Sequence, residues 1–291
     1  MPEPVDPAAG PARRAFPPAT AVVLPGSGSD DDFVRRAFTG PLAALGIRLV
    51  APAPLPGRAV VAGYREALDD AAAGATARGE ALLAGGVSLG ALVAARWAAD
   101  RAGAAGCPQP PSGRSPDAGR RAPGHTCGRT AAGPLAGLLL ALPAWTGEPG
   151  DAPAALAARA SAAQVRAAGV DGAVRAARAG APAWLADELA RAWAGHGPGL
   201  ADALDTAAAE PGPDGAALAR IAVPAGVVAA VDDPVHPLAV ADAWCAWLPW
   251  ARLVTTRLDA LGADPAVLGR AAVLGWLHAR NACRPDPIPR T

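Results

Sequence analysis

The stretch Gly86-Val87-Ser88-Leu89-Gly90, with the apolar run Ala81-Leu82-Leu83-Ala84 just before it, decides the fold of this chain. The apolar run has the length and composition of a buried strand, and residues 89–100 carry large apolar side chains at helical intervals. Glycines two residues before and after the serine allow a sharp turn from strand to helix, which exposes the serine hydroxyl at the end of the sheet. The sequence therefore predicts a nucleophilic Ser88.

Strands and helices alternate along most of the remaining chain. Apolar runs predict strands at 21–24, 47–50, 135–142, 226–231 and 251–256, and helical periodicity predicts helices at 31–45, 64–78, 238–248 and 265–278. Such alternation is typical of an α/β protein with a mostly parallel sheet, helices on both faces and a site at the carboxyl ends of the strands. Residues from about 151 to 220 are instead Ala-rich and wholly helical in pattern.

A second group of polar residues follows the predicted strand at 226–231. It reads Asp232-Asp233-Pro234-Val235-His236-Pro237. A carboxylate at this edge of the sheet can orient an imidazole and stabilise its protonated form. Aspartate and proline are also common in turns and helix caps, so a solvated turn is the alternative interpretation.

With these motifs the chain resembles the α/β-hydrolase superfamily over about residues 21–277, apart from one inserted segment. The resemblance implies an α/β-hydrolase core at 21–150 and 221–280, and a helical cap at 151–220. It implies Ser88 as nucleophile, Asp233 as triad acid with Asp232 in reserve, and the amides of Ser27 and Leu89 as oxyanion hole. Pro25-Gly26 stands where the family often has His-Gly, so only the backbone of this loop is expected to act.

The family's histidine is missing from its usual place. Residues 257–265, after the last predicted strand, contain none. A serine hydroxyl without a neighbouring base is a poor nucleophile. His236 can approach the catalytic edge, although its position favours the entry to the next helix, and His196 can reach the pocket from a helix end. For both residues a surface or capping role is the alternative. His278, near the end of the last helix, is expected to be remote.

Two hypotheses of different classes follow from this pattern. In the first, the chain is a serine hydrolase, esterase-like, that cleaves a small ester or other acyl substrate through an acyl-enzyme on Ser88. In the second, it is a pseudoenzyme, a hydrolase-like protein that uses its pocket to bind a ligand or serves as an interaction module. Ser88 and Asp233 favour the first hypothesis, whereas the missing histidine favours the second.

Composition excludes several other classes. The chain has 291 residues, a formal net charge of zero and 26 basic residues, all of them arginine. Without lysine there is neither a Schiff-base lysine nor a P-loop lysine. No basic cluster predicts a nucleic-acid partner, and no apolar run predicts a membrane span. The expected partner is a small-molecule substrate or ligand, with no cofactor and no metal.

Three further expectations concern the ends, one insertion and the cysteines. Residues 1–20 and 281–291 are expected to lie outside the fold, and 101–133, rich in Pro, Gly and Arg, to form an insertion that contributes nothing to core or site. The four cysteines lack CxxC spacing, which predicts a reduced, cytoplasmic protein. A metal clip of Cys107, Cys127 and His125 within the insertion is the alternative.

Overall fold

A computed structural model describes residues 18–104 and 135–283 of the chain. Its centre is a six-stranded sheet in the order β2-β1-β3-β4-β5-β6, in which every neighbouring pair is parallel. The strands are β1 (Pro18–Leu24), β2 (Arg48–Val50), β3 (Ala81–Val87), β4 (Leu135–Ala141), β5 (Ala225–Ala230) and β6 (Ala251–Thr256). This confirms the predicted parallel α/β fold.

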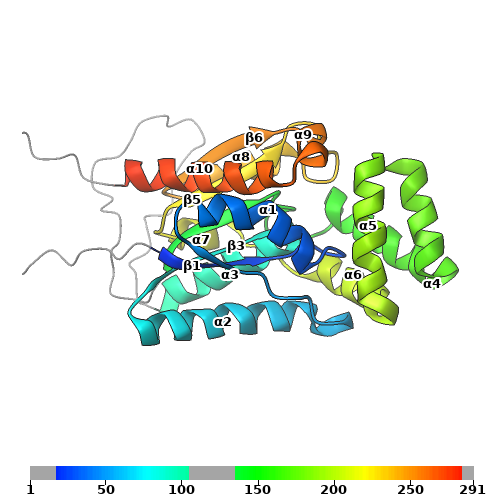
Figure 1. The fold of residues 1–291 in the computed structure, drawn as a ribbon, viewed down its shortest axis with the longest axis horizontal. Helices are drawn as coiled ribbons and strands as arrows, with labels where there is room; N and C mark the ends of the chain where they lie inside the picture. The colour runs from blue at the N-terminus through cyan, green and yellow to red at the C-terminus, as the bar shows by residue number, and fades with distance from the viewer. Residues whose placement is uncertain (1–17, 105–134, 284–291) are drawn as a thin grey trace, which may run out of the picture.

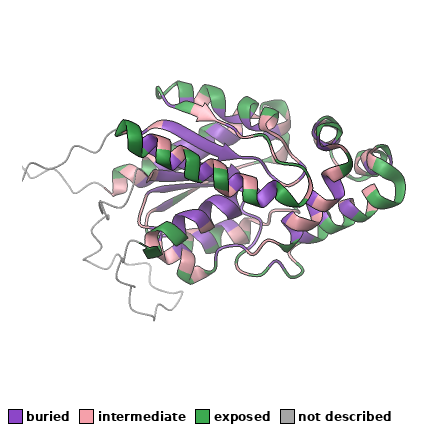
Figure 2. Ribbon diagram, turned by 90° about the horizontal axis from the view of Figure 1, so that it is seen from below, coloured by how far each residue is buried: buried purple, intermediate pink, exposed green. Residues whose placement is uncertain are grey.

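Helices cover both faces of the sheet, as Figures 1 and 2 show. One face carries α2 (Val60–Arg78), α3 (Leu89–Ala104), α7 (Gly215–Arg220) and α8 (Leu238–Trp247). The other carries α1 (Asp31–Ala43), α9 (Leu258–Ala263) and α10 (Ala266–Ala282). Side chains of a strand point alternately to the two faces, so Leu82 of β3 packs on the first side and Leu83 on the second. Burial on both faces explains why the inner strands β1, β3, β4 and β5 are largely continuous apolar runs.

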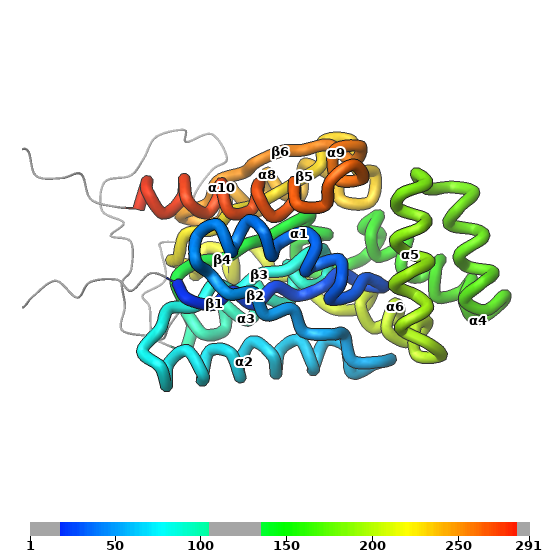
Figure 3. Tube along the Cα trace, viewed as in Figure 1, coloured from blue at the N-terminus to red at the C-terminus, as the bar shows by residue number. Residues whose placement is uncertain are grey.

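The remaining helices gather at one end of the molecule, to the right in Figures 1 and 3. They are α4 (Pro153–Gly180), α5 (Ala183–His196) and α6 (Leu200–Ala209), with the short 3₁₀ turn η2 (Gly197–Gly199) between the last two. We call α4, α5 and α6 the cap. α6 packs on α4 and on η1 (Gly57–Ala59), a 3₁₀ turn of the core. Within α4, Gly169 has φ 70° and ψ 177°, so two helical segments meet at a kink there.

Several boundaries differ from those expected from the sequence. β1 begins at Pro18, inside the expected N-terminal segment, and α3 continues to Ala104, so residues 101–104 are helix and not insertion. α7 lies within the range expected for the cap, yet it packs on α3 and α8 of the core. The rest of the expected insertion, with Cys107, His125 and Cys127, lies outside the described residues.

All strands run in the same direction, which brings their carboxyl ends to one edge. Leu24 of β1 pairs with Gly86 of β3, Val87 pairs with Ala141 of β4, and Ala230 of β5 pairs with Thr256 of β6. The loops that follow these residues therefore share the end of the sheet where the cap is attached.

Candidate active site

Ser88 lies at a sharp turn between β3 and α3, as the sequence predicts. Its φ of 53° is in the left-handed region, which is unusual for a residue other than glycine. Its amide donates to the carbonyl of Ala141, 2.9 Å away, while its own carbonyl accepts from the amides of Ala91 and Leu92 in the first turn of α3. The turn is thus held by β4 on one side and by α3 on the other, and this is the geometry of a nucleophile elbow.

The two glycines of the motif make this turn sterically possible. A Cβ atom on Gly86 would lie 2.2 Å from the carbonyl carbon of Gly90, and one on Gly90 would lie 2.3 Å from the carbonyl oxygen of Leu24. Both distances are far inside van der Waals contact and both involve backbone atoms, which cannot move aside. Glycine is therefore required at both positions for α3 to begin so close to β1 and β3.

Asp233 and His236 lie together in the turn between β5 and α8. One carboxylate oxygen of Asp233, Oδ1, accepts from the amides of Val235 and His236, at 2.8 and 3.1 Å. The other oxygen, Oδ2, lies 2.8 Å from Nδ1 of the His236 ring. The carboxylate thus shapes the turn and orients the imidazole that the turn carries.

The same ring reaches across the edge of the sheet to Ser88. Nε2 of His236 lies 2.9 Å from Oγ of Ser88, although 148 positions separate the two residues in the sequence. The side chains of His236 and Asp233 are 15% and 6% exposed, and Ser88 is 9% exposed, so the chain of hydrogen bonds is largely shielded from water. Serine, imidazole and carboxylate form one continuous line.

The pKa of the Asp233 carboxyl lies below its usual value. Burial alone would raise it, but the hydrogen bond and the charge of the His236 ring, together with the amides of Val235 and His236, stabilise the ionised form more strongly. With Asp233 ionised, Nδ1 of His236 donates to the carboxylate. In the neutral form of the ring, Nε2 then carries no proton and can accept one from the Ser88 hydroxyl.

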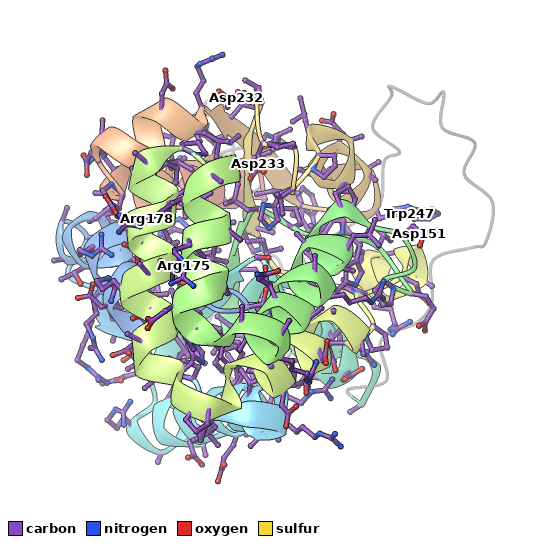
Figure 4. The ribbon with its side chains drawn as sticks, turned by 90° about the vertical axis from the view of Figure 1, so that its right-hand side faces the viewer. Asp151, Arg175, Arg178, Asp232, Asp233 and Trp247 are labelled. Atoms are coloured by element: carbon purple, nitrogen blue, oxygen red, sulfur yellow. The ribbon has the colours of Figure 1, made fainter. Side chains whose placement is uncertain are left out.

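The loop after β6, where the resemblance would place the histidine, begins with Arg257. Its guanidinium, 60% exposed, lies 3.1 Å from the carboxylate of Asp232, and the amide of Leu258 donates to the same carboxylate. Asp232, the reserve acid, thus ties the loop after β5 to the loop after β6 and does not touch His236. Figure 4 shows Asp232 nearer the rim of this end of the molecule than Asp233.

His236 lies at the entry to the next helix, as its sequence position suggests, and its ring nevertheless contacts Ser88. α8 begins at Leu238 with Pro237 as its N-cap residue, so His236 belongs to the preceding turn. Pro234 and Pro237 flank the turn. The hydrogen bonds from the amides of Val235 and His236 to Asp233 fold the backbone so that the His236 side chain points back toward the sheet. The sequence signal for this contact is a histidine three residues after the aspartate, with one proline following each of them.

His196, the other candidate base, is engaged elsewhere. It is 8% exposed at the end of α5, and its Nε2 lies 2.9 Å from the carbonyl oxygen of Ser29. A carbonyl oxygen only accepts, so Nε2 of His196 carries a proton and donates it. His278 is exposed on α10.

The expected oxyanion loop, residues 25–30 between β1 and α1, lies beside Ser88. A Cβ atom on Gly26 would be 3.4 Å from Cβ of Ser88. The loop turns between Gly26 and Ser29, whose amide donates to the Gly26 carbonyl at 3.2 Å, and Gly28 has the positive φ, 67°, that such a turn favours. Ser27 lies at the tip of this turn, and Leu89 directly follows the nucleophile; that their two amides form an oxyanion hole stays a prediction of the resemblance.

Solved structures share this fold at low sequence identity. A carboxylesterase of Nitrososphaera gargenis matches with a TM-score of 0.59 and 11% identity over 84% of this chain and 82% of its own. A Mycobacterium tuberculosis protein assigned as a non-heme bromoperoxidase matches with a TM-score of 0.58 and 17% identity over 91% and 94%. The enol-lactonase of Burkholderia xenovorans matches with a TM-score of 0.54 and 16% identity over 86% and 90%. No protein-family model and no curated protein matches the sequence.

The chain therefore has the α/β-hydrolase fold. Within residues 18–104 and 135–283, no three His, Cys, Asp or Glu side chains are grouped so that they could hold a metal ion. In the same part of the chain, no helix has both the length and the apolar character needed to cross a membrane.

Proposed function

We propose that this protein is a serine hydrolase that cleaves small esters or related acyl substrates through an acyl-enzyme on Ser88. The observation that carries the proposal is the continuous hydrogen-bonded line from Ser88 Oγ through His236 to Asp233. It supplies the base whose absence favoured a ligand-binding role. Two of the compared structures are named for action on carboxyl esters and on an enol-lactone, which supports acyl transfer as the reaction class.

In the proposed reaction, Nε2 of His236 takes the proton of the Ser88 hydroxyl as Oγ attacks the carbonyl carbon of the substrate. The carbonyl π bond opens to an oxyanion, which the amides of Ser27 and Leu89 stabilise. Asp233 holds the imidazolium in place without taking its proton. When the tetrahedral intermediate collapses, Nε2 returns the proton to the leaving oxygen, and the acyl group stays on Ser88.

The second half repeats these steps with water as nucleophile. His236 removes a proton from water, the hydroxide attacks the acyl carbon, and the proton passes to Ser88 as its bond to the acyl group breaks. The carboxylic acid leaves and the enzyme is restored.

The test is covalent labelling with a fluorophosphonate, which reacts through the same activated hydroxyl. We expect wild-type protein to be labelled at neutral pH on Ser88, as read by peptide mass spectrometry, and Ser88→Ala to give no adduct. His236→Ala should react more slowly by a factor of about 10² or greater, because the proton acceptor is lost. His278→Ala, which removes an exposed histidine of α10, is the matched control and should react like wild type.

Two results would overturn the proposal. One is a wild-type protein that fails to react under conditions that modify ordinary serine hydrolases, which would favour the ligand-binding role. The other is His236→Ala reacting at the wild-type rate, which would show that the base lies elsewhere.

A further inference from the structure

Three side chains near the C-terminal end of cap helix α5 contact the expected oxyanion loop, residues 25–30. Arg191 donates to both carboxylate oxygens of Asp30, at 2.6 and 2.8 Å. His196 donates to the carbonyl of Ser29 at 2.9 Å. The indole of Trp193, 3% exposed, lies against Gly28, so close that a Cβ atom there would be 2.7 Å from its nitrogen. Loop residues 28, 29 and 30 therefore each contact a different side chain of the cap.

Asp30 makes these contacts continuous with the core. Asp30 is the N-cap residue of α1, and its side chain also accepts a hydrogen bond from the amide of Phe33 at 3.0 Å. Burial opposes ionisation of Asp30, but the hydrogen bond from Arg191 and the Phe33 amide outweigh it and lower the pKa of the carboxyl. Arg191 also pairs with Glu188, which in turn pairs with Arg36 of α1 at 2.5 Å. A charged network thus fastens α5 to the helix that follows the loop.

The loop has little internal structure to hold its shape. Within residues 25–30 the described backbone makes one hydrogen bond, from Ser29 to Gly26, at a long 3.2 Å. The amide of Ser27 is in the middle of this turn. The direction of the Ser27 amide therefore depends on the contacts of the residues on either side. On the C-terminal side these contacts come from the α5 side chains and, at Asp30, from the first turn of α1.

We infer that Arg191 and His196 are positioning residues for the oxyanion hole, and that the cap builds part of the catalytic machinery in addition to covering it. The inference rests on the proposed hydrolase function. A displaced donor loses most of its effect on the transition state, while substrate binding in the ground state changes little. Loss of either side chain should therefore lower the rate of the chemical step and leave affinity nearly unchanged.

Hydrogen–deuterium exchange and fluorophosphonate kinetics test this together. In His196→Ala and Arg191→Ala, peptides covering residues 25–30 should exchange faster than in wild type. The maximal labelling rate should fall about 10-fold to 10²-fold, whereas the inhibitor constant should stay within about 3-fold. His196→Gln keeps an N–H donor and should restore most of the rate. Arg191→Lys keeps the charge but loses the two-pronged contact, so it should restore little.

Arg178→Ala is the matched control. Arg178 is also a cap arginine, paired with Asp187 at 2.8 Å, but both side chains are mostly exposed and belong to the cap alone. It should leave exchange and labelling unchanged. Unchanged exchange in both alanine variants would overturn the inference, and so would faster exchange with an unchanged labelling rate. A wild-type protein that is not labelled at all would instead overturn the proposed function, and the exchange data would still decide whether α5 holds the loop.

Discussion

Asp233 and His236 are three residues apart, and their contact is made within one turn. In the pattern implied by the family resemblance, acid and base come from loops after two different strands. Here the loop after β5 supplies both, while the loop after β6 supplies Arg257, which pairs with Asp232.

A histidine at the first residue after β6 should not restore the site. We expect His236→Ala/Arg257→His to be labelled as slowly as His236→Ala, about 10²-fold below wild type, because the side chain at 257 faces Asp232 and solvent. Fluorophosphonate labelling rates measure this. Arg257→Ala alone should react like wild type, and recovery of more than about 10-fold in the double variant would contradict the placement of position 257.

At the scale of elements, the junction of β3 and α3 leaves no room for a side chain at Gly86. Gly86→Ala should lower the free energy of unfolding by about 3 kcal/mol or prevent folding, because its Cβ would lie 2.2 Å from the Gly90 carbonyl carbon. Gly40→Ala in α1, where nothing lies within 4 Å, should be neutral or stabilise by up to about 1 kcal/mol. Urea unfolding would compare them, and equal effects would show that packing at Gly86 is loose.

The kink in α4 is a second feature of this scale. Gly169 has φ 70° and ψ 177°, a region that is open to glycine and strained for other residues, although there is free space around it. Gly169→Ala should therefore destabilise the cap by about 1–3 kcal/mol through backbone strain alone. Gly180→Ala, also in open space but with an ordinary φ, is the control. Limited proteolysis of the cap would read the difference, and equal resistance of both variants would argue against strain at the kink.

At the scale of the whole molecule, two partly buried carboxylates link parts that are distant in sequence. Asp233 binds the His236 ring, which contacts Ser88 on the other side, and Asp30 joins the core to the cap. Both have lowered pKa values in the folded state. The unfolded chain therefore binds more protons than the folded chain around pH 3–4, and stability falls as the pH falls through this range.

A pH series of unfolding experiments tests this linkage. At pH 7 wild type should be more stable than Asp233→Asn by about 2 kcal/mol, since hydrogen bonds to a charged group are lost. The difference should shrink as the pH drops from about 5, above the unfolded value of about 3.9, toward the lower folded value. A difference that stays constant from pH 7 to pH 3 would show that Asp233 is not stabilised in its ionised form.

Much of this molecule could be predicted from local sequence. The strands, the helices on both faces and the elbow at Ser88 follow from apolar periodicity and from two glycines, because those signals act over a few residues. The turn of His236 depends on how a carboxylate folds the backbone behind it, and no periodicity reports that. The role of His196 depends on a contact with Ser29, 167 positions away, and only the packed structure reveals such a contact.

The short turn that joins Asp233 to His236 also has a mechanical consequence. When acid and base come from separate loops, every relative motion of the strands stretches the contact between them. Here both residues belong to one turn held by two backbone hydrogen bonds, so we expect motion of the outer strand β6 to leave their contact intact. The hydrogen bond between His236 and Ser88 joins the turns after two different strands, β5 and β3. We therefore expect relative motion of these strands to lengthen this contact before the one between Asp233 and His236.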